Sequence, residues 1–109
     1  MSYTATCDGA EPVYPLGAAA RGVLDYSPGG RVSVHIMGAG YFAYYGYYTV
    51  DEKAGTVTHH LELCSERSLA GASNLRHIAL DGPRLVLSGS MDLGGKPHTI
   101  RVVWERPAE

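Results

Sequence analysis

The sequence predicts an all-β fold, an antiparallel up-and-down barrel of about eight strands, built by a single domain over residues 1–109. Runs of β-branched and aromatic residues recur at intervals of roughly 8–12 residues and are separated by glycine, proline and aspartate. The chain has 14 glycines in 109 residues, which suits many tight turns. A chain of this length builds one core but no separate catalytic module. The barrel itself must therefore carry any functional site.

Each strand is predicted where β-branched or aromatic residues gather, and each ends at a turn signal. The first five predicted strands are Tyr3–Cys7, Gly22–Tyr26, Arg31–Met37, Phe42–Val50 and Thr56–Cys64. The turns that end the first four of them are, in order, Asp8-Gly9, Ser27-Pro28-Gly29-Gly30, Gly38-Ala39-Gly40 and residues 51–55. The later ones are Asn74–Leu80 and Arg84–Ser88, joined by Asp81-Gly82-Pro83, and Thr99–Glu105, preceded by Gly94-Gly95-Lys96-Pro97. Helical signal is weak, with room for a turn or two at residues 16–20 and 65–72.

The nearly continuous alternation of strand and turn favours closure of the sheet into a barrel. Closure removes the edge strands that a small domain must otherwise protect. An eight-stranded barrel either fills with side chains or holds one small ligand. A two-layer sandwich is the alternative arrangement.

The segment from Tyr41 to Tyr48 carries six of the chain's ten aromatic residues. In an extended strand, side chains alternate between the two faces. One face here carries Phe42, Tyr44, Tyr48 and Val50, and the other carries Tyr41, Ala43, Tyr45, Tyr47 and Thr49. Because both faces are aromatic, this strand is expected to lie between a ligand cavity and a subunit contact, as in a homodimer.

His59 and His60 are adjacent in the next predicted strand, so they point to opposite faces and cannot chelate one metal ion together. In the simpler interpretation, one imidazole is exposed and the other is a hydrogen-bonded core residue. In the alternative, one of them is a general acid or base inside the cavity, oriented by a tyrosine or by Glu62. The catalytic candidates are His59, His60 and Tyr44.

Tyrosine suits a cavity for an apolar, oxygenated compound, because its ring packs and its hydroxyl hydrogen-bonds a carbonyl. Arginine can hold a carboxylate or phenolate if its side chain points inward. The candidate ligand-binding residues are polar or aromatic side chains in or beside the predicted strands: Tyr26, His35, Tyr45, Tyr48, Glu62, Arg76, Arg101 and Trp104.

Several classes of function are disfavoured by composition and motifs. The formal net charge is −2 and the nine basic residues are scattered, which argues against nucleic-acid binding. The sequence has no apolar run near the roughly 18 residues of a membrane helix and begins without a leader pattern, so we expect a cytoplasmic protein without a membrane partner. It also lacks the motifs of a P-loop, a dinucleotide site, a nucleophile elbow and a metal site. We therefore expect chemistry without cofactor or metal, and free thiols at Cys7 and Cys64.

Several segments resemble one family. They are VYPLG (13–17), GVLDYSPGGR (22–31), YYGYY (44–48), GTVTHHLE (55–62), LDG (80–82) with RL (84–85), and VWER (103–106). Together they resemble the lipocalin-like domain proteins, small calycin-type barrels often encoded near natural-product pathways. The chain lacks the Gly-Thr-Trp strand start common in that family, and residues 65–71 replace an Asn-Trp segment. Both departures fall at barrel ends, which makes dimerisation a plausible way to cover one mouth.

The resemblance implies a small-molecule-binding barrel, with two competing classes of function. The first is a cofactor-free cyclase or isomerase of a carbonyl-rich, polyketide-like intermediate, aided by histidine or tyrosine. The second is a non-catalytic carrier of a hydrophobic ligand. An aromatic platform for single-stranded nucleic acid is a third option, which the acidic balance disfavours.

Overall fold

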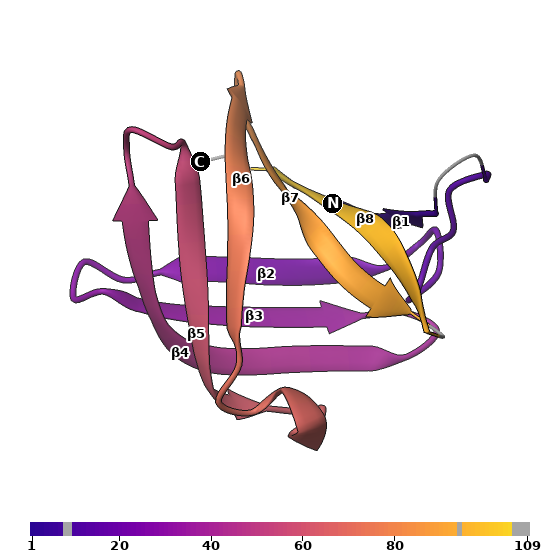
Figure 1. Ribbon diagram of the computed structural model, residues 1–109, viewed down its shortest axis with the longest axis horizontal. Coiled ribbons are helices and arrows are strands. Elements are labelled where there is room, and N and C mark those ends of the chain that lie inside the picture. Colours follow the sequence, from indigo (N-terminus) through magenta and orange to yellow (C-terminus); the bar gives the residue numbers. More distant parts are fainter. Residues whose placement is uncertain (8–9, 94, 106–109) are drawn as a thin grey trace.

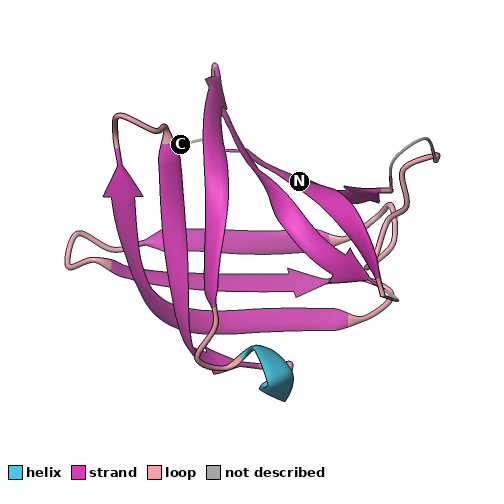
Figure 2. Cartoon of the chain, in the orientation of Figure 1, coloured by secondary structure: helices cyan, strands magenta, loops and turns pink. Residues whose placement is uncertain are grey.

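The computed structural model describes residues 1–7, 10–93 and 95–105, and these form an almost entirely β structure (Figures 1 and 2). The predicted all-β class is confirmed. In the described part of the chain, no helix is long and apolar enough to cross a membrane. The elements are β1 (Ser2–Thr6), β2 (Arg21–Tyr26), β3 (Arg31–Met37), β4 (Tyr41–Asp51), β5 (Thr56–Cys64), the short 3-10 helix η1 (Arg67–Leu69), β6 (Ser73–Asp81), β7 (Arg84–Leu93) and β8 (Lys96–Glu105).

The eight strands form one antiparallel sheet in the order β1-β8-β7-β6-β5-β4-β3-β2. From β2 to β8 each strand pairs with the next in sequence, and β1 pairs with β8, which gives the predicted up-and-down order. Figure 1 shows β4 curving from its place beside β3 to its place beside β5, so that the sheet wraps around on itself. Because β1 and β2 occupy the two ends of the strand order, the barrel is nearly closed and a seam remains along β2.

Two irregularities shape the wall of the barrel. A bulge between Tyr45 and Gly46 of β4 leaves Glu62 of β5 as an extra residue, and such bulges bend a strand sharply. Strands β6 and β7 pair only from the His77–Ser88 pair to the hairpin turn. Beyond that pair they diverge, as Figure 1 shows.

The last two strands are longer than the sequence pattern predicts. The sequence pattern predicts that β7 ends at Ser88 and that β8 begins at Thr99, but the pairing continues to Leu93 and Lys96. Small and polar residues hide the alternation in this part of β7, and Pro97 lies near the start of β8, where the missing N–H is tolerated. Of the predicted turns, Asp8-Gly9 and Gly94 lie outside the described residues.

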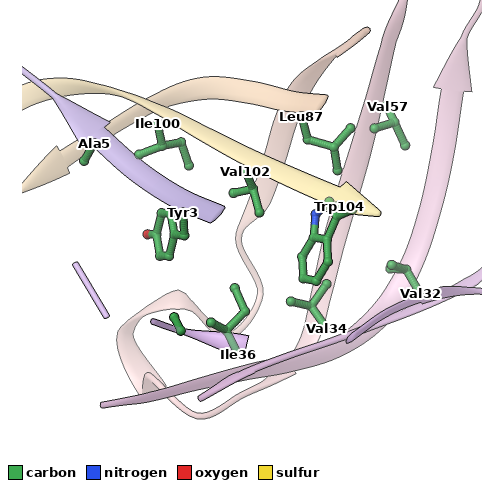
Figure 3. Packing of buried hydrophobic residues seen from close by; sticks show 11 residues of the cluster. Tyr3, Ala5, Val32, Val34, Ile36, Val57, Leu87, Ile100, Val102 and Trp104 are labelled. Carbon is green, nitrogen blue, oxygen red and sulfur yellow. The ribbon is translucent and has the colours of Figure 1, made fainter. Parts of the chain in front are cut away.

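The core is formed by inward-facing residues that alternate along the strands (Figure 3). Strands β1, β3 and β8 supply most of it, and Trp104 of β8 lies against Val34 of β3. The buried cluster comprises Tyr3, Ala5, Ala20, Val32, Val34, Ile36, Val57, Leu87, Ile100, Val102 and Trp104. The interior is therefore apolar except where a few polar side chains from β2, β4, β5 and β6 enter it.

Candidate functional site

The most buried polar side chain is that of His59, which is 1% exposed and points into the barrel from β5. The hydroxyl of Tyr26, from β2, lies 2.6 Å from its Nε2. The hydroxyl of Tyr44, from β4, lies 2.5 Å from its Nδ1. Three strands thus bring together a continuous hydrogen-bonded group, which we name the Tyr26–His59–Tyr44 chain. Alternation explains the orientation of His59, because Val57 and Leu61 on the same face of β5 are also buried.

The imidazole of His59 and the phenols of Tyr26 and Tyr44 are all uncharged near neutral pH. Burial, together with the smaller effects of the charges of Arg76 and His60, lowers the pKa of His59 to about 4. Burial raises the pKa of Tyr26 and of Tyr44 well above the usual value of 10. The Tyr26–His59–Tyr44 chain is therefore a series of hydrogen bonds between neutral groups.

The Tyr26–His59–Tyr44 chain contains one hydrogen-bond donor that its own hydrogen bonds do not use. A neutral imidazole carries one N–H and one lone pair. One ring nitrogen of His59 accepts a hydrogen bond from one tyrosine hydroxyl, and the N–H of the other donates a hydrogen bond to the oxygen of the second tyrosine. The second tyrosine keeps its own O–H proton for a third partner. One phenol of the chain can therefore donate a hydrogen bond to a group in an adjoining space.

Tyr26 adjoins an apolar chamber of about 180 Å³. A cavity of about 150 Å³ holds a benzene molecule, so this chamber accommodates one aromatic ring. Tyr48 packs edge-on against Tyr26, with ring centroids 4.7 Å apart, and donates its hydroxyl proton to the Ser27 carbonyl at 3.1 Å. It therefore offers the chamber its ring rather than its hydroxyl. The apolar chamber is lined by Tyr26, Tyr48, Val50, Val57, Ile78, Leu85 and Leu87.

The chamber adjoins a groove of about 350 Å³ that runs along the seam of the barrel, between β2 and the ends of β6, β7 and β8. We name it the seam groove. Tyr26 and Leu85 line both spaces. A molecule longer than one ring can therefore extend from the chamber into the groove. The other residues of the seam groove are Gly22, Val23, Leu24, Leu80, Gly82, Pro83, Arg84, Trp104 and Glu105.

Tyr44, at the other end of the hydrogen-bonded chain, adjoins a smaller cavity of about 40 Å³, which is lined mostly by apolar residues. This volume is close to that of one water molecule. Asn74 and Arg76 of β6 supply its polar wall, together with His59. The Tyr26–His59–Tyr44 chain thus connects the apolar chamber with the small cavity beside Tyr44.

The structure divides the residues proposed from the sequence into two groups. His59, Tyr44, Tyr26, Tyr48, Arg76 and Trp104 line the interior spaces. The other candidates, His60, His35, Tyr45, Glu62 and Arg101, belong to the outer face of the sheet and do not reach these spaces.

Specific outer contacts explain why His60 and Glu62 take no part in the interior. The ring of His60 stacks on Tyr47, with centroids 4.4 Å apart, and hydrogen-bonds the hydroxyls of Thr49 and Ser73. Glu62 forms an exposed ion pair with Arg31. The aromatic outer face of β4 stays exposed, so the homodimer remains a prediction.

Sequence reasoning missed the part of the site that β6 and β7 supply. Asn74 and Ile78 flank Arg76 on the inner face of β6, and Leu85 and Leu87 lie on the inner face of β7. Alternation along β6, counted from an inward Arg76, could have identified the first two. Within the described residues, no group of three or more histidine, cysteine, aspartate or glutamate side chains could hold a metal ion, and Cys7 and Cys64 are free thiols.

The buried imidazole predicts that the protein loses stability in acid. The pKa of His59 is about 4 in the folded protein, against an ordinary value of 6.5. Between these values the unfolded chain binds a proton that the folded chain does not, so the free energy of unfolding falls as the pH falls from about 6.5 to about 4. The full loss is roughly 3 kcal/mol. Urea unfolding at about pH 7 and about pH 4.5 measures most of this loss.

The control for this prediction is His59→Gln, which keeps hydrogen-bonding atoms but does not titrate. We expect a smaller loss of stability in this variant over the same pH interval. Equal losses in the two proteins would show that other groups cause the acid sensitivity.

Comparison with known families gives a match over most of the chain. The sequence model of a family described as a lipocalin-like domain matches residues 37–107, which is more than half of the chain. The matched region contains β4 to β8, and with them Tyr44, His59 and Arg76, but not Tyr26. Comparisons with curated proteins and with solved structures gave no significant match.

Proposed function

The chain belongs to the lipocalin-like domain family, and from this premise we propose that it is a cofactor-free cyclase or isomerase of an apolar, carbonyl-rich, polyketide-like compound. The family and the barrel support the binding of a small molecule in the interior. The proposal of catalysis depends on one observation. The apolar chamber has a single hydrogen-bonded polar chain at its wall, the Tyr26–His59–Tyr44 chain, with one proton free to donate.

We assign the free proton to Tyr26, because Tyr26 adjoins the chamber large enough for a ring. In this arrangement Tyr44 donates to Nδ1 of His59, and Nε2–H of His59 donates to the Tyr26 oxygen. Accepting that bond polarises the Tyr26 hydroxyl and strengthens its own donation. The Tyr26 O–H then hydrogen-bonds the carbonyl oxygen of the bound compound.

A neutral donor at the wall of an apolar pocket suits reactions in which negative charge develops on a carbonyl oxygen. Closing a ring by attack on an enone, or shifting a double bond toward a carbonyl, develops charge in this way. His59 is a weak base because burial lowers its pKa to about 4, and both of its ring nitrogens are already bonded. We therefore propose that His59 positions Tyr26 and polarises it, and that it does not abstract a proton from the substrate.

The walls of the chamber supply the second contribution. Tyr48, Val57 and Leu87 enclose one end of a bound molecule, and the seam groove takes the rest. Holding a flexible compound in the conformation that cyclises reduces the entropic part of the barrier. The size and apolar lining of the chamber favour an apolar compound that carries one aromatic ring.

The carrier function is the second candidate. The neutral state of the Tyr26–His59–Tyr44 chain favours the carrier function. A neutral phenol can fix the orientation of a carbonyl without any turnover. The two functions differ in whether a bound compound is converted.

The test uses two related compounds. In 2′-hydroxychalcone the phenol oxygen adds to the β carbon of the enone, charge moves to the carbonyl oxygen, and the phenol proton ends on the α carbon to give flavanone. Chalcone lacks the hydroxyl and can only bind. Cyclisation is followed by absorbance, and chalcone binding by the fluorescence of the single tryptophan, Trp104, in the seam groove. Accelerated cyclisation supports the enzyme, binding of both compounds without acceleration supports the carrier, and no binding of either contradicts both.

A further inference from the structure

The wall of the barrel is open on its outer side where β6 and β7 diverge. The pairing of the two strands stops at His77 and Ser88, although β6 continues to pair with β5 and β7 with β8. A groove of about 380 Å³ occupies the space between them. We name it the β6–β7 groove. Hydroxyl groups of Ser73, Ser88, Ser90 and Thr99 lie along its walls.

Arg76 sits at the base of this groove, in the wall between inside and outside. Both Arg76 and Asn74 line the β6–β7 groove and also the small cavity next to Tyr44. Gly89 of β7 makes room for the guanidinium, because a Cβ at that position would lie 2.7 Å from Nη1 of Arg76. The missing side chain at residue 89 therefore allows the arginine to lie in the gap.

The charge of Arg76 is not balanced by a carboxylate of the described residues. The ion pairs among them are Arg31–Glu62 and Arg84–Glu105, and both are exposed to solvent. Arg76 donates one hydrogen bond, from Nη1 to the carbonyl of Leu75 at 2.9 Å. A guanidinium has five N–H donors in a planar fork, so most of its donors are available to a ligand. A half-buried cation without an anionic partner is costly unless something else pairs with it.

We propose that the β6–β7 groove is a binding site for a small planar organic carboxylate, held by the guanidinium fork of Arg76 and by the amide of Asn74. The fork matches the two oxygens of a carboxylate, and the volume of the groove exceeds that of an aromatic ring. This site lies at the Tyr44 end of the hydrogen-bonded chain, whereas the apolar chamber lies at the Tyr26 end. It goes beyond the proposed function and does not depend on it.

The experiment compares benzoate with benzamide, which has nearly the same shape but no charge, by NMR titration of the backbone amide signals. Benzoate is expected to shift the signals of Arg76, Gly89 and Ser90 and to bind at least about 10-fold more tightly than benzamide. Arg76→Met should remove this preference. Arg101→Met, at an exposed position of β8, should keep it.

Equal binding of the two compounds by the wild-type protein would overturn the proposal, as would a preference that survives Arg76→Met. Arg76→Lys provides a second variant if Arg76→Met does not fold. It keeps the charge but loses the planar fork, so a reduced preference is expected and an undiminished one contradicts the role of the fork. Binding of chalcone to Arg76→Met, measured in parallel, shows separately whether the apolar chamber is intact.

Discussion

Replacing Tyr26 with phenylalanine is expected to slow cyclisation of 2′-hydroxychalcone by roughly 10²–10³-fold, the usual cost of losing one donor to a developing oxyanion. The ring of Tyr26 still lines the apolar chamber in this variant. Chalcone should therefore lose no more than roughly 10-fold in affinity, the net value of one hydrogen bond, and the larger loss should appear in kcat. Initial rates over a range of substrate concentrations separate the two effects.

Tyr48→Phe is the matched control for Tyr26→Phe. Tyr48 lines the same chamber and packs against Tyr26, but its hydroxyl is bonded to the Ser27 carbonyl. We expect its rate to stay within roughly 10-fold of the wild-type rate, below the range for loss of a donor. Similar losses in both variants would mean that chamber packing, and not the hydroxyl of Tyr26, drives the reaction.

Filling the apolar chamber should abolish binding. Ile78 is partly buried and projects into the chamber from β6. In Ile78→Trp the indole occupies space that a ligand ring would take, and we expect the affinity for chalcone to fall by at least about 100-fold, equivalent to about 2.7 kcal/mol. Calorimetry is the suitable measurement, because the new tryptophan would complicate fluorescence.

The neighbouring residue gives the control for Ile78→Trp. Ala79 is exposed on the outer face of β6, so Ala79→Trp adds the same side chain outside the barrel. It should bind chalcone as the wild-type protein does. If Ile78→Trp also binds normally while folded, the ligand lies elsewhere and the chamber is not the binding site.

The strand pattern of this fold could be predicted from the sequence, because runs of β-branched and aromatic residues alternate with clear turn residues. Arg31–Met37 and Thr56–Cys64 are confirmed with the predicted bounds. The extension of β7 beyond Ser88 could not be predicted from the sequence. Its last residues pair with β8 through backbone hydrogen bonds, and Gly89 and Ser90 carry no hydrophobic signal of a strand.

The candidate site could be predicted from the sequence only in part. Alternation shows that His59 and His60 point to opposite faces, but both faces of the neighbouring β4 are aromatic, so the sequence does not say which histidine lies inside. That choice follows from burial of Val57 and Leu61 next to His59. The meeting of Tyr26, Tyr44 and His59 depends on the curvature of β4 and on the bulge at Glu62, which no local pattern encodes. The same holds for Arg76, whose surroundings arise from the divergence of β6 and β7.

The position of a bound carbonyl group tests the central claim most directly. We would determine a crystal structure of the protein with chalcone and measure the distance from its carbonyl oxygen to the Tyr26 hydroxyl. With the ring in the apolar chamber, this distance is expected to be about 2.6–3.2 Å. A ligand bound outside the chamber, or a carbonyl oxygen beyond hydrogen-bond distance of Tyr26, would contradict the proposed role of the Tyr26–His59–Tyr44 chain.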